Sequence, residues 1–158
     1  MEIVFELRED QVKLYDRRLI YKFLDNLVES IKKDIKDALI PAKFEMLERG
    51  LLNANWIRWK TKPSGINISK LVDRILSCIT WQERKTSFRI YIDPKMKMPY
   101  TVNTSLERVA RFLDKGNNVS KHSTMFSRVF NYYQKNINEF WKAYLEVGYI
   151  LDVEGEDY

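Results

Sequence analysis

The feature that most restricts the fold is a long apolar stripe in the first quarter of the chain. Its residues are spaced three or four positions apart: Val12, Tyr15, Leu19, Phe23, Leu27, Ile31, Ile35 and Leu39. This spacing predicts an amphipathic helix over about residues 10–40, because 3.6 residues make one helical turn. Proline disrupts a helix interior, so we expect this helix to end at Pro41, with a shorter one over 42–49. The rest of the chain must then cover the stripe.

The remaining patterns indicate a mixture of strands and helices. Residues 2–7 alternate like a short strand, and residues 56–59 form a second alternating piece. A short helix near 69–74 is expected to lead into a hairpin at about 75–92, with its polar turn at 82–85. Thr104 and Glu107 have the spacing of a capping box, and Ser123 can cap a last helix. These elements predict an α+β fold: a long N-terminal helix, a small antiparallel sheet and two C-terminal amphipathic helices.

Composition indicates one globular domain. Hydrophobic residues make up 45% of the 158 residues and charged residues 31%. We expect a single domain over residues 1–150 and a disordered acidic tail over 151–158. Cys78 is the only cysteine, which excludes an intrachain disulfide and favours a reducing compartment. The first ten residues are acidic where a signal peptide is basic, and no apolar run approaches the roughly 18 residues that span a bilayer, so a cytoplasmic protein without membrane contact is expected.

Charge is distributed unevenly along the chain. Residues 1–55 hold 10 Lys/Arg and 11 Asp/Glu, residues 56–128 hold 15 and 5, and residues 129–158 hold 2 and 6. The middle of the chain is therefore basic and its end acidic. Such asymmetry favours an acidic partner for the middle, either nucleic acid or another subunit, although a solvated basic face is equally compatible with it.

Known catalytic patterns are mostly missing. His122 is the only histidine, so a structural zinc site cannot be assembled with Cys78, and the scattered glycines form no phosphate-binding loop. We therefore expect a non-enzyme without cofactors or metals. One alternative is a magnesium-dependent nuclease that uses Asp73, Glu83 and Lys85, in the order of the Asp…Glu-x-Lys pattern. Its weakness is that Glu83 and Lys85 fall in the predicted hairpin turn.

A second alternative is a small basic nucleic-acid-binding protein. The segment Trp56-Ile-Arg-Trp-Lys-Thr-Lys62 alternates indole rings with cations, which can stack on unpaired bases and neutralise phosphates. A strand with its tryptophans turned inward explains the same pattern. No zinc finger, helix-turn-helix or ribonucleoprotein sheet signature accompanies it.

The later part of the chain resembles a known family. Its segments are Gly65-Ile-Asn-Ile-Ser-Lys-Leu-Val-Asp-Arg-Ile75 before the hairpin, Leu106-Glu-Arg-Val-Ala-Arg-Phe-Leu-Asp-Lys-Gly-Asn117, and a helix opened by Met125-Phe126. Together they resemble the neck, or tail-completion, proteins of the head–tail connector of tailed bacteriophages. The similarity extends loosely over residues 65–145. The turn Asp114-Lys-Gly116-Asn117 stands where the family has an acidic residue, glycine and threonine.

The resemblance implies a structural virion protein made in the cytoplasm of a bacterial host. It implies a ring of identical subunits around the DNA path, in contact with portal, adaptor or tail proteins and, non-specifically, with double-stranded DNA. A ring subunit needs two different faces that meet head to tail. Expected partner or DNA contacts are the basic residues Arg58, Lys60, Lys62, Arg108 and Arg111. The aromatic stripe of the last helix is expected to contribute an apolar interface through Phe126, Phe130, Tyr133 and Trp141.

Overall fold

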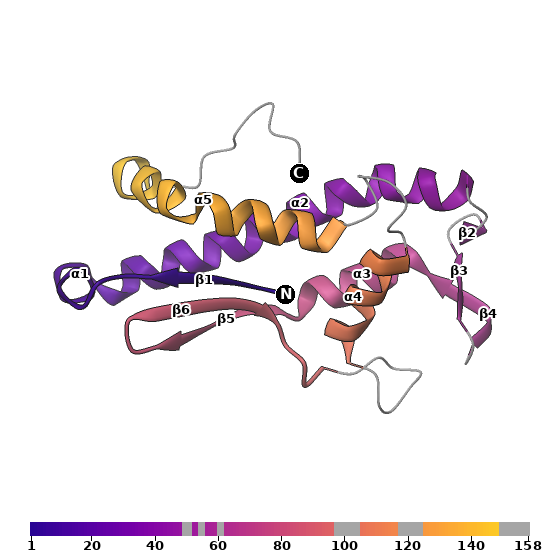
Figure 1. Ribbon diagram of the computed structural model, residues 1–158, viewed down its shortest axis with the longest axis horizontal. Coiled ribbons are helices and arrows are strands. Elements are labelled where there is room, and N and C mark those ends of the chain that lie inside the picture. Colours follow the sequence, from indigo (N-terminus) through magenta and orange to yellow (C-terminus); the bar gives the residue numbers. More distant parts are fainter. Residues whose placement is uncertain (49–51, 54–55, 60–61, 97–104, 117–124, 149–158) are drawn as a thin grey trace.

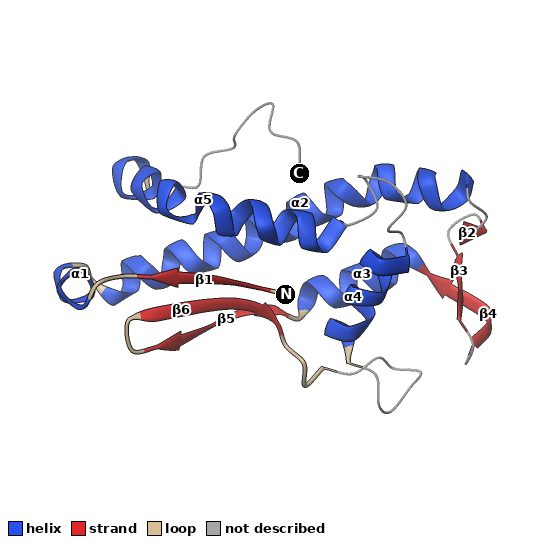
Figure 2. Cartoon of the chain, in the orientation of Figure 1, coloured by secondary structure: helices blue, strands red, loops and turns tan. Residues whose placement is uncertain are grey.

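The computed structural model describes the chain except residues 49–51, 54–55, 60–61, 97–104, 117–124 and 149–158. Its elements follow in the order β1, α1, α2, β2, β3, β4, α3, β5, β6, α4 and α5 (Figure 1). Five helices and two small antiparallel sheets form the secondary structure of the described residues, so the predicted α+β class is confirmed (Figure 2).

The long helix α2 (Arg17–Glu48) extends along most of the molecule (Figure 1). Its 32 residues correspond to about 48 Å at 1.5 Å per residue. The predicted stripe is confirmed from Phe23 to Leu39, where its members are buried. The predicted start was wrong. A separate helix, α1 (Glu9–Leu14), precedes α2, and Asp16 begins α2 by accepting a hydrogen bond from the Arg18 backbone N–H at 2.9 Å.

The predicted end of this helix at Pro41 was also wrong, because α2 continues for seven more residues. Proline inside a helix removes one backbone hydrogen bond and costs about 3 kcal/mol. Pro41 is exposed, so its ring displaces no core side chain. Ala42 and Met46, on the inner side of the next turns, are each 1% exposed. Their burial offsets the cost of the proline, which the local pattern alone does not reveal.

The first sheet has the strand order β1 (Glu2–Glu6), β6 (Ser87–Ile92), β5 (Ile79–Arg84), all antiparallel. The predicted hairpin exists, but its strands meet at a tight two-residue loop, Lys85 and Thr86, and not at a turn over 82–85. Lys85 adopts a left-handed φ of 37° to close this loop. Residues 75–77 belong to the preceding helix.

That helix, α3 (Ile68–Ser77), is longer than the predicted 69–74 and continues three residues beyond the predicted end. Asn67 caps its first turn by accepting from the Lys70 N–H at 3.1 Å. A second small sheet precedes it, formed by β2 (Leu52–Asn53), β3 (Trp56–Trp59) and β4 (Lys62–Asn67).

The two predicted C-terminal helices are α4 (Leu106–Gly116) and α5 (Met125–Val147). Ser105 caps α4, because its side chain accepts from the Arg108 N–H at 3.2 Å. Thr104, the predicted cap, lies outside the described residues, as does the expected tail over 151–158.

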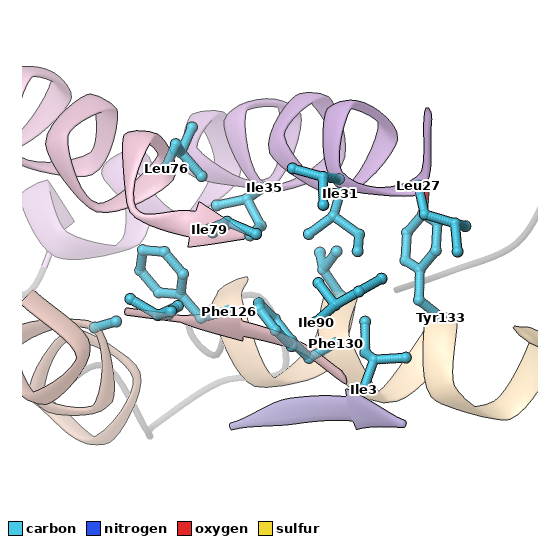
Figure 3. Close-up of a cluster of buried hydrophobic side chains, with 14 of the residues drawn as sticks. Ile3, Leu27, Ile31, Ile35, Leu76, Ile79, Ile90, Phe126, Phe130 and Tyr133 are labelled. Atoms are coloured by element: carbon cyan, nitrogen blue, oxygen red, sulfur yellow. The ribbon is translucent and has the colours of Figure 1, made fainter. Parts of the chain in front are cut away.

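One continuous apolar core joins the first sheet to α2 and α5. Ile3 and Ile90 pair across β1 and β6, and Phe130 of α5 extends into the same cluster (Figure 3). Phe5 touches both Phe23 of α2 and Trp141 of α5, with ring centroids 5.3 and 5.5 Å apart. The opposite face of the sheet carries mostly polar side chains, among them Glu2, Gln82 and Arg89. Among the described helices, none is long and apolar enough to cross a membrane.

Candidate assembly surfaces

The predicted basic contacts on α4 lie on the molecular surface. Arg108 and Arg111 are both exposed, and their spacing of three residues places them on one side of the helix. Arg111 forms an ion pair with Glu107 at 2.7 Å, whereas Arg108 has no ion-pair partner among the described residues. Glu107 therefore compensates the positive charge of Arg111 within α4. Arg108 keeps its charge available and is the stronger candidate for a contact with an acidic partner.

The other three predicted basic contacts belong to the second sheet or its turn. Arg58 is in β3 and Lys62 begins β4, while Lys60 lies outside the described residues. The backbones of β3 and β4 pair from Trp56 and Asn67 to Trp59 and Lys62. The structure therefore brings Arg58 and Lys62 into neighbouring strands. Arg108 belongs to a different element, the helix α4.

The predicted aromatic interface is corrected by the structure. Phe126, Phe130, Tyr133 and Trp141 are 0%, 1%, 3% and 6% exposed, so all four lie within the chain's own core. They are buried because α5 packs across α2 and β1 at once, which uses a wide apolar face. The Tyr133 hydroxyl donates a hydrogen bond to Asp34 of α2, which satisfies its polar end inside the fold.

A different apolar surface is exposed on the last turns of α2. Ile40, Phe44 and Leu47 are 61%, 66% and 42% exposed, and their spacing of four and three residues aligns them on the outward side. We call these three residues the α2 patch. The sequence contained a signal for this exposed apolar surface, because apolar residues occur on both the inner and the outer face of a helix drawn through this segment. The predicted helix break at Pro41 concealed their common face.

A second group of exposed apolar side chains lies at the other end of the molecule. Leu14 of α1 is 75% exposed, and Leu145 and Val147 in the last turn of α5 are 36% and 44% exposed. Leu145 and Val147 are two positions apart, so they face different sides of α5, and the three residues share an end of the molecule but not one helix face. The rings of Tyr15 and Trp141, 5.4 Å apart, connect α1 to the end of α5. Figure 1 shows α1 and the end of α5 at one extremity and the end of α2 at the other.

The two edges of the first sheet differ. At the β1 edge, the Gln134 side chain accepts from the Val4 N–H at 2.7 Å and donates to the Val4 carbonyl at 3.0 Å. A side-chain amide thus takes the place of a neighbouring strand, which hinders pairing with another chain. At the β5 edge, Trp81 and Glu83 reach α2 instead: Trp81 Nε1 donates to Asp25 at 2.7 Å, and Glu83 binds Arg17.

Asp114 joins the two C-terminal helices and is the one buried charged residue in the described part of the chain. It lies on α4, yet its two carboxylate oxygens accept from the backbone N–H groups of Phe126 at 3.0 Å and Ser127 at 2.8 Å. Both groups are in the first turn of α5, where the helix dipole favours a negative charge. Burial raises the pKa of Asp114, and the hydrogen bonds from Phe126 and Ser127 offset only part of this effect.

The possible nuclease site is not assembled. Asp73 pairs with Lys36 at 3.5 Å, whereas Glu83 pairs with Arg17. Lys36 and Arg17 are separated by about 28 Å along α2, given a rise of 1.5 Å per residue. A magnesium ion holds its oxygen ligands at about 2.1 Å, so these two carboxylates cannot bind one ion. Glu83 is also within β5 and not in the turn, while Lys85 is in the turn as predicted.

The remaining reactive side chains form no site within the described residues. Cys78 is buried, and burial raises the pKa of its thiol, which opposes formation of a nucleophilic thiolate. His122 is outside the described residues. Within the described part of the chain, no group of three or more His, Cys, Asp or Glu side chains is arranged to hold a metal ion.

Comparisons with known proteins give no assignment. No family model, no curated protein and no solved structure matches this chain.

Proposed function

We propose that this chain is a structural subunit of the head–tail connector of a tailed bacteriophage, which assembles with copies of itself into a ring around the DNA path. Neighbouring portal, adaptor or tail proteins would contact this ring, and the protein would be made in the bacterial cytoplasm and end in the virion. The sequence resemblance over residues 65–145 motivates the proposal.

The observation that carries the proposal is the exposure of large apolar side chains on two separated surfaces. Phe44 in the α2 patch and Leu14 of α1 are 66% and 75% exposed. Grouped apolar exposure of this kind is typical of surfaces that bind other proteins. A subunit that contacts neighbours on two sides requires two such surfaces.

The junction between α4 and α5 supports the same proposal. The resemblance rests partly on the end of α4 and the start of α5, and Asp114 binds these two segments together through Phe126 and Ser127. The exposed side of α4 is thereby fixed relative to the core, which suits a surface that must meet a partner in one orientation.

The genes that flank the coding sequence provide the first test. Genes for a large terminase subunit, a portal protein and a major capsid protein nearby would support a connector subunit. Restriction, repair or regulatory genes without virion genes would contradict it and favour the nucleic-acid-binding alternative.

The predicted contact on α4 can be tested by charge reversal. Arg108→Glu combined with Arg111→Glu should block ring assembly, because both positions are exposed and an acidic partner surface would repel the new charges. The free energy of unfolding, measured in urea, should change by no more than about 0.5 kcal/mol, as expected for exposed residues. Rings that form normally, seen by electron microscopy, would remove these arginines from the interface.

A further inference from the structure

The β5 edge of the first sheet lacks the closure that Gln134 gives to the β1 edge. The strand order β1-β6-β5 places β1 at one edge and β5 at the other (Figure 1). The side chain of Gln134 bonds both the N–H and the C=O of Val4 in β1. No equivalent group from the described residues bonds the outer side of the β5 backbone. An open edge of this kind is a template for another strand.

The register identifies the backbone groups that β5 leaves unpaired. The Asp93 N–H donates to the Cys78 carbonyl at 2.9 Å, which continues the β5–β6 ladder by one hydrogen-bonded pair. Such pairs recur at every second residue of an antiparallel ladder, so Trp81 and Glu83 direct their N–H and C=O groups away from β6. The ladder has no bulge over the six residues of β5. These groups are therefore arranged for pairing with a further antiparallel strand.

An aromatic pair borders this edge on the core side of the sheet. The rings of Tyr21 and Trp81 stack with their centroids 5.1 Å apart, and both side chains are partly exposed. Asp25 accepts a hydrogen bond from Trp81 Nε1 at 2.7 Å, and Glu83 accepts one from the Tyr21 hydroxyl at 2.6 Å. A residue directly opposite Trp81 on an added strand has its side chain on the same face. A β-branched apolar residue suits that position, because such residues pair favourably with aromatic ones across strands.

The charges around the edge favour an acidic occupant. Arg84 at the end of β5, Lys85 in the turn and Lys22 of α2 are exposed, and none has an ion-pair partner within the described part of the chain. The acidic residues nearby are engaged, Glu83 in an ion pair with α2 and Asp25 in its bond to the indole. A second copy would bring another set of these basic residues to the same edge, which disfavours pairing of two β5 strands. An acidic strand is attracted instead.

We infer that β5 binds an extended acidic segment of another protein, which joins the three-stranded first sheet as a further antiparallel strand. Every second residue of this segment is apolar, packs against the pair of Tyr21 and Trp81, and exchanges backbone hydrogen bonds with Trp81 and Glu83. The residues between them point to the outer face of the sheet, where acidic side chains meet Arg84. This contact goes beyond the connector proposal, because it uses a surface that the proposal does not involve.

Amide hydrogen exchange followed by NMR tests the open edge in the free chain. The N–H groups of Trp81 and Glu83 should exchange at least about tenfold faster than those of Thr80 and Gln82, whose backbones bond to β6. Equal protection of all four amides would show that the edge is already covered, and this result would overturn the inference.

A short synthetic peptide of alternating valine and glutamate is the probe for the occupant. Fluorescence anisotropy of the labelled peptide should show saturable binding below several hundred micromolar, and the amides of Trp81 and Glu83 should then become protected. Methylation of the valine amide nitrogens, which face β5, should weaken binding by at least about tenfold. Methylation of the glutamate amide nitrogens, which face away from β5, is the matched control and should change it by less than about threefold. Equal effects of the two methylations, or no binding, would overturn the inference.

Two pairs of variants separate the backbone contact from the charge. Glu83→Pro removes an edge N–H but no bond to β6, whereas Glu83→Ala loses the same side chain and keeps the N–H. Proline should weaken peptide binding about tenfold relative to alanine. Arg84→Glu should weaken it about threefold to tenfold, and Lys142→Glu, at an exposed position of α5, should leave it unchanged. Circular dichroism and urea unfolding check that each variant keeps the fold.

Equal affinities of the proline and alanine variants would overturn the backbone contact. Equal affinities of Arg84→Glu and Lys142→Glu would overturn the choice of an acidic segment. These results are independent of the connector proposal. A chain whose gene lies among virion genes but whose β5 edge binds no peptide would contradict this contact alone. A chain that binds the peptide as described but whose gene lies far from virion genes would contradict the connector function alone.

Discussion

Replacement of Asp114 should weaken the junction between α4 and α5 by a calculable amount. The side chain is 7% exposed and accepts hydrogen bonds from two backbone N–H groups of α5, at Phe126 and Ser127. A hydrogen bond to a charged group contributes about 1.5–3 kcal/mol, but the burial of the carboxylate opposes this gain. We expect Asp114→Ala to lower the free energy of unfolding by about 2–3 kcal/mol. Asp114→Asn should cost about 1–2 kcal/mol, since its amide keeps one acceptor.

The cost of Asp114→Asn should depend on pH in a defined direction. Burial raises the pKa of Asp114 above its ordinary value of 3.8, so the folded chain retains this proton to higher pH than the unfolded chain. This tighter proton binding by the folded chain stabilises the fold. Its contribution is complete at pH values below the ordinary pKa of Asp114 and is lost as the pH rises through the pKa of the folded state. Asparagine does not titrate. The stability difference between the two proteins should therefore be largest near the acidic end of this window and smaller at neutral pH.

Urea unfolding followed by tryptophan fluorescence can measure this difference at a series of pH values from about 3.5 to 7, bracketing the ordinary pKa. The other titrating groups are common to both proteins, so their effects cancel in the comparison. A stability difference that grows with pH would refute the reasoning. It would show that the hydrogen bonds from Phe126 and Ser127 favour the ionised carboxylate more strongly than burial disfavours it.

Three further changes test the packing of the fold. Pro41→Ala should raise the free energy of unfolding by about 1–3 kcal/mol, because alanine restores a backbone donor in α2; a lower urea midpoint would contradict this. Phe130→Ala should lower it by about 3–5 kcal/mol, since this ring is 1% exposed, and thermal unfolding followed by circular dichroism should show the loss; an unchanged melting temperature would place the ring outside the core. Gln134→Ala should cost about 1–2 kcal/mol and increase light scattering on storage, because the Val4 edge of the sheet becomes open to other chains; scattering equal to that of the unaltered protein would show that this edge needs no protection.

Local patterns were sufficient for most elements because their causes are local. The apolar spacing from Phe23 to Leu39 determined the buried side of α2, and the alternation of Ser87–Ile92 determined a strand. The amphipathic helices at the C-terminal end followed from the same periodicity. In each case the apolar residues that form the sequence pattern are also the residues that pack into the core. A short stretch of sequence is therefore enough to predict the element.

The candidate surfaces were harder to predict, because exposure is a property of the whole fold. The sequence shows that α5 is rich in aromatic residues, but only its packing across α2 and β1 decided that Phe130 and Trp141 are internal. The burial of a helix face depends on which distant elements pack against that face. The apolar spacing in the sequence is the same whether another protein or the chain itself covers the face.

What the sequence alone determined is the fold class, the main amphipathic sides and the separation of basic and acidic segments along the chain. What only the tertiary structure decided is the continuation of α2 through Pro41, the bond from Asp114 to α5, and the exposure of Phe44. The physical reason is the same for all three. Each depends on a free-energy balance between a local cost and contacts with residues far away in the sequence, and those contacts exist only once the chain has folded.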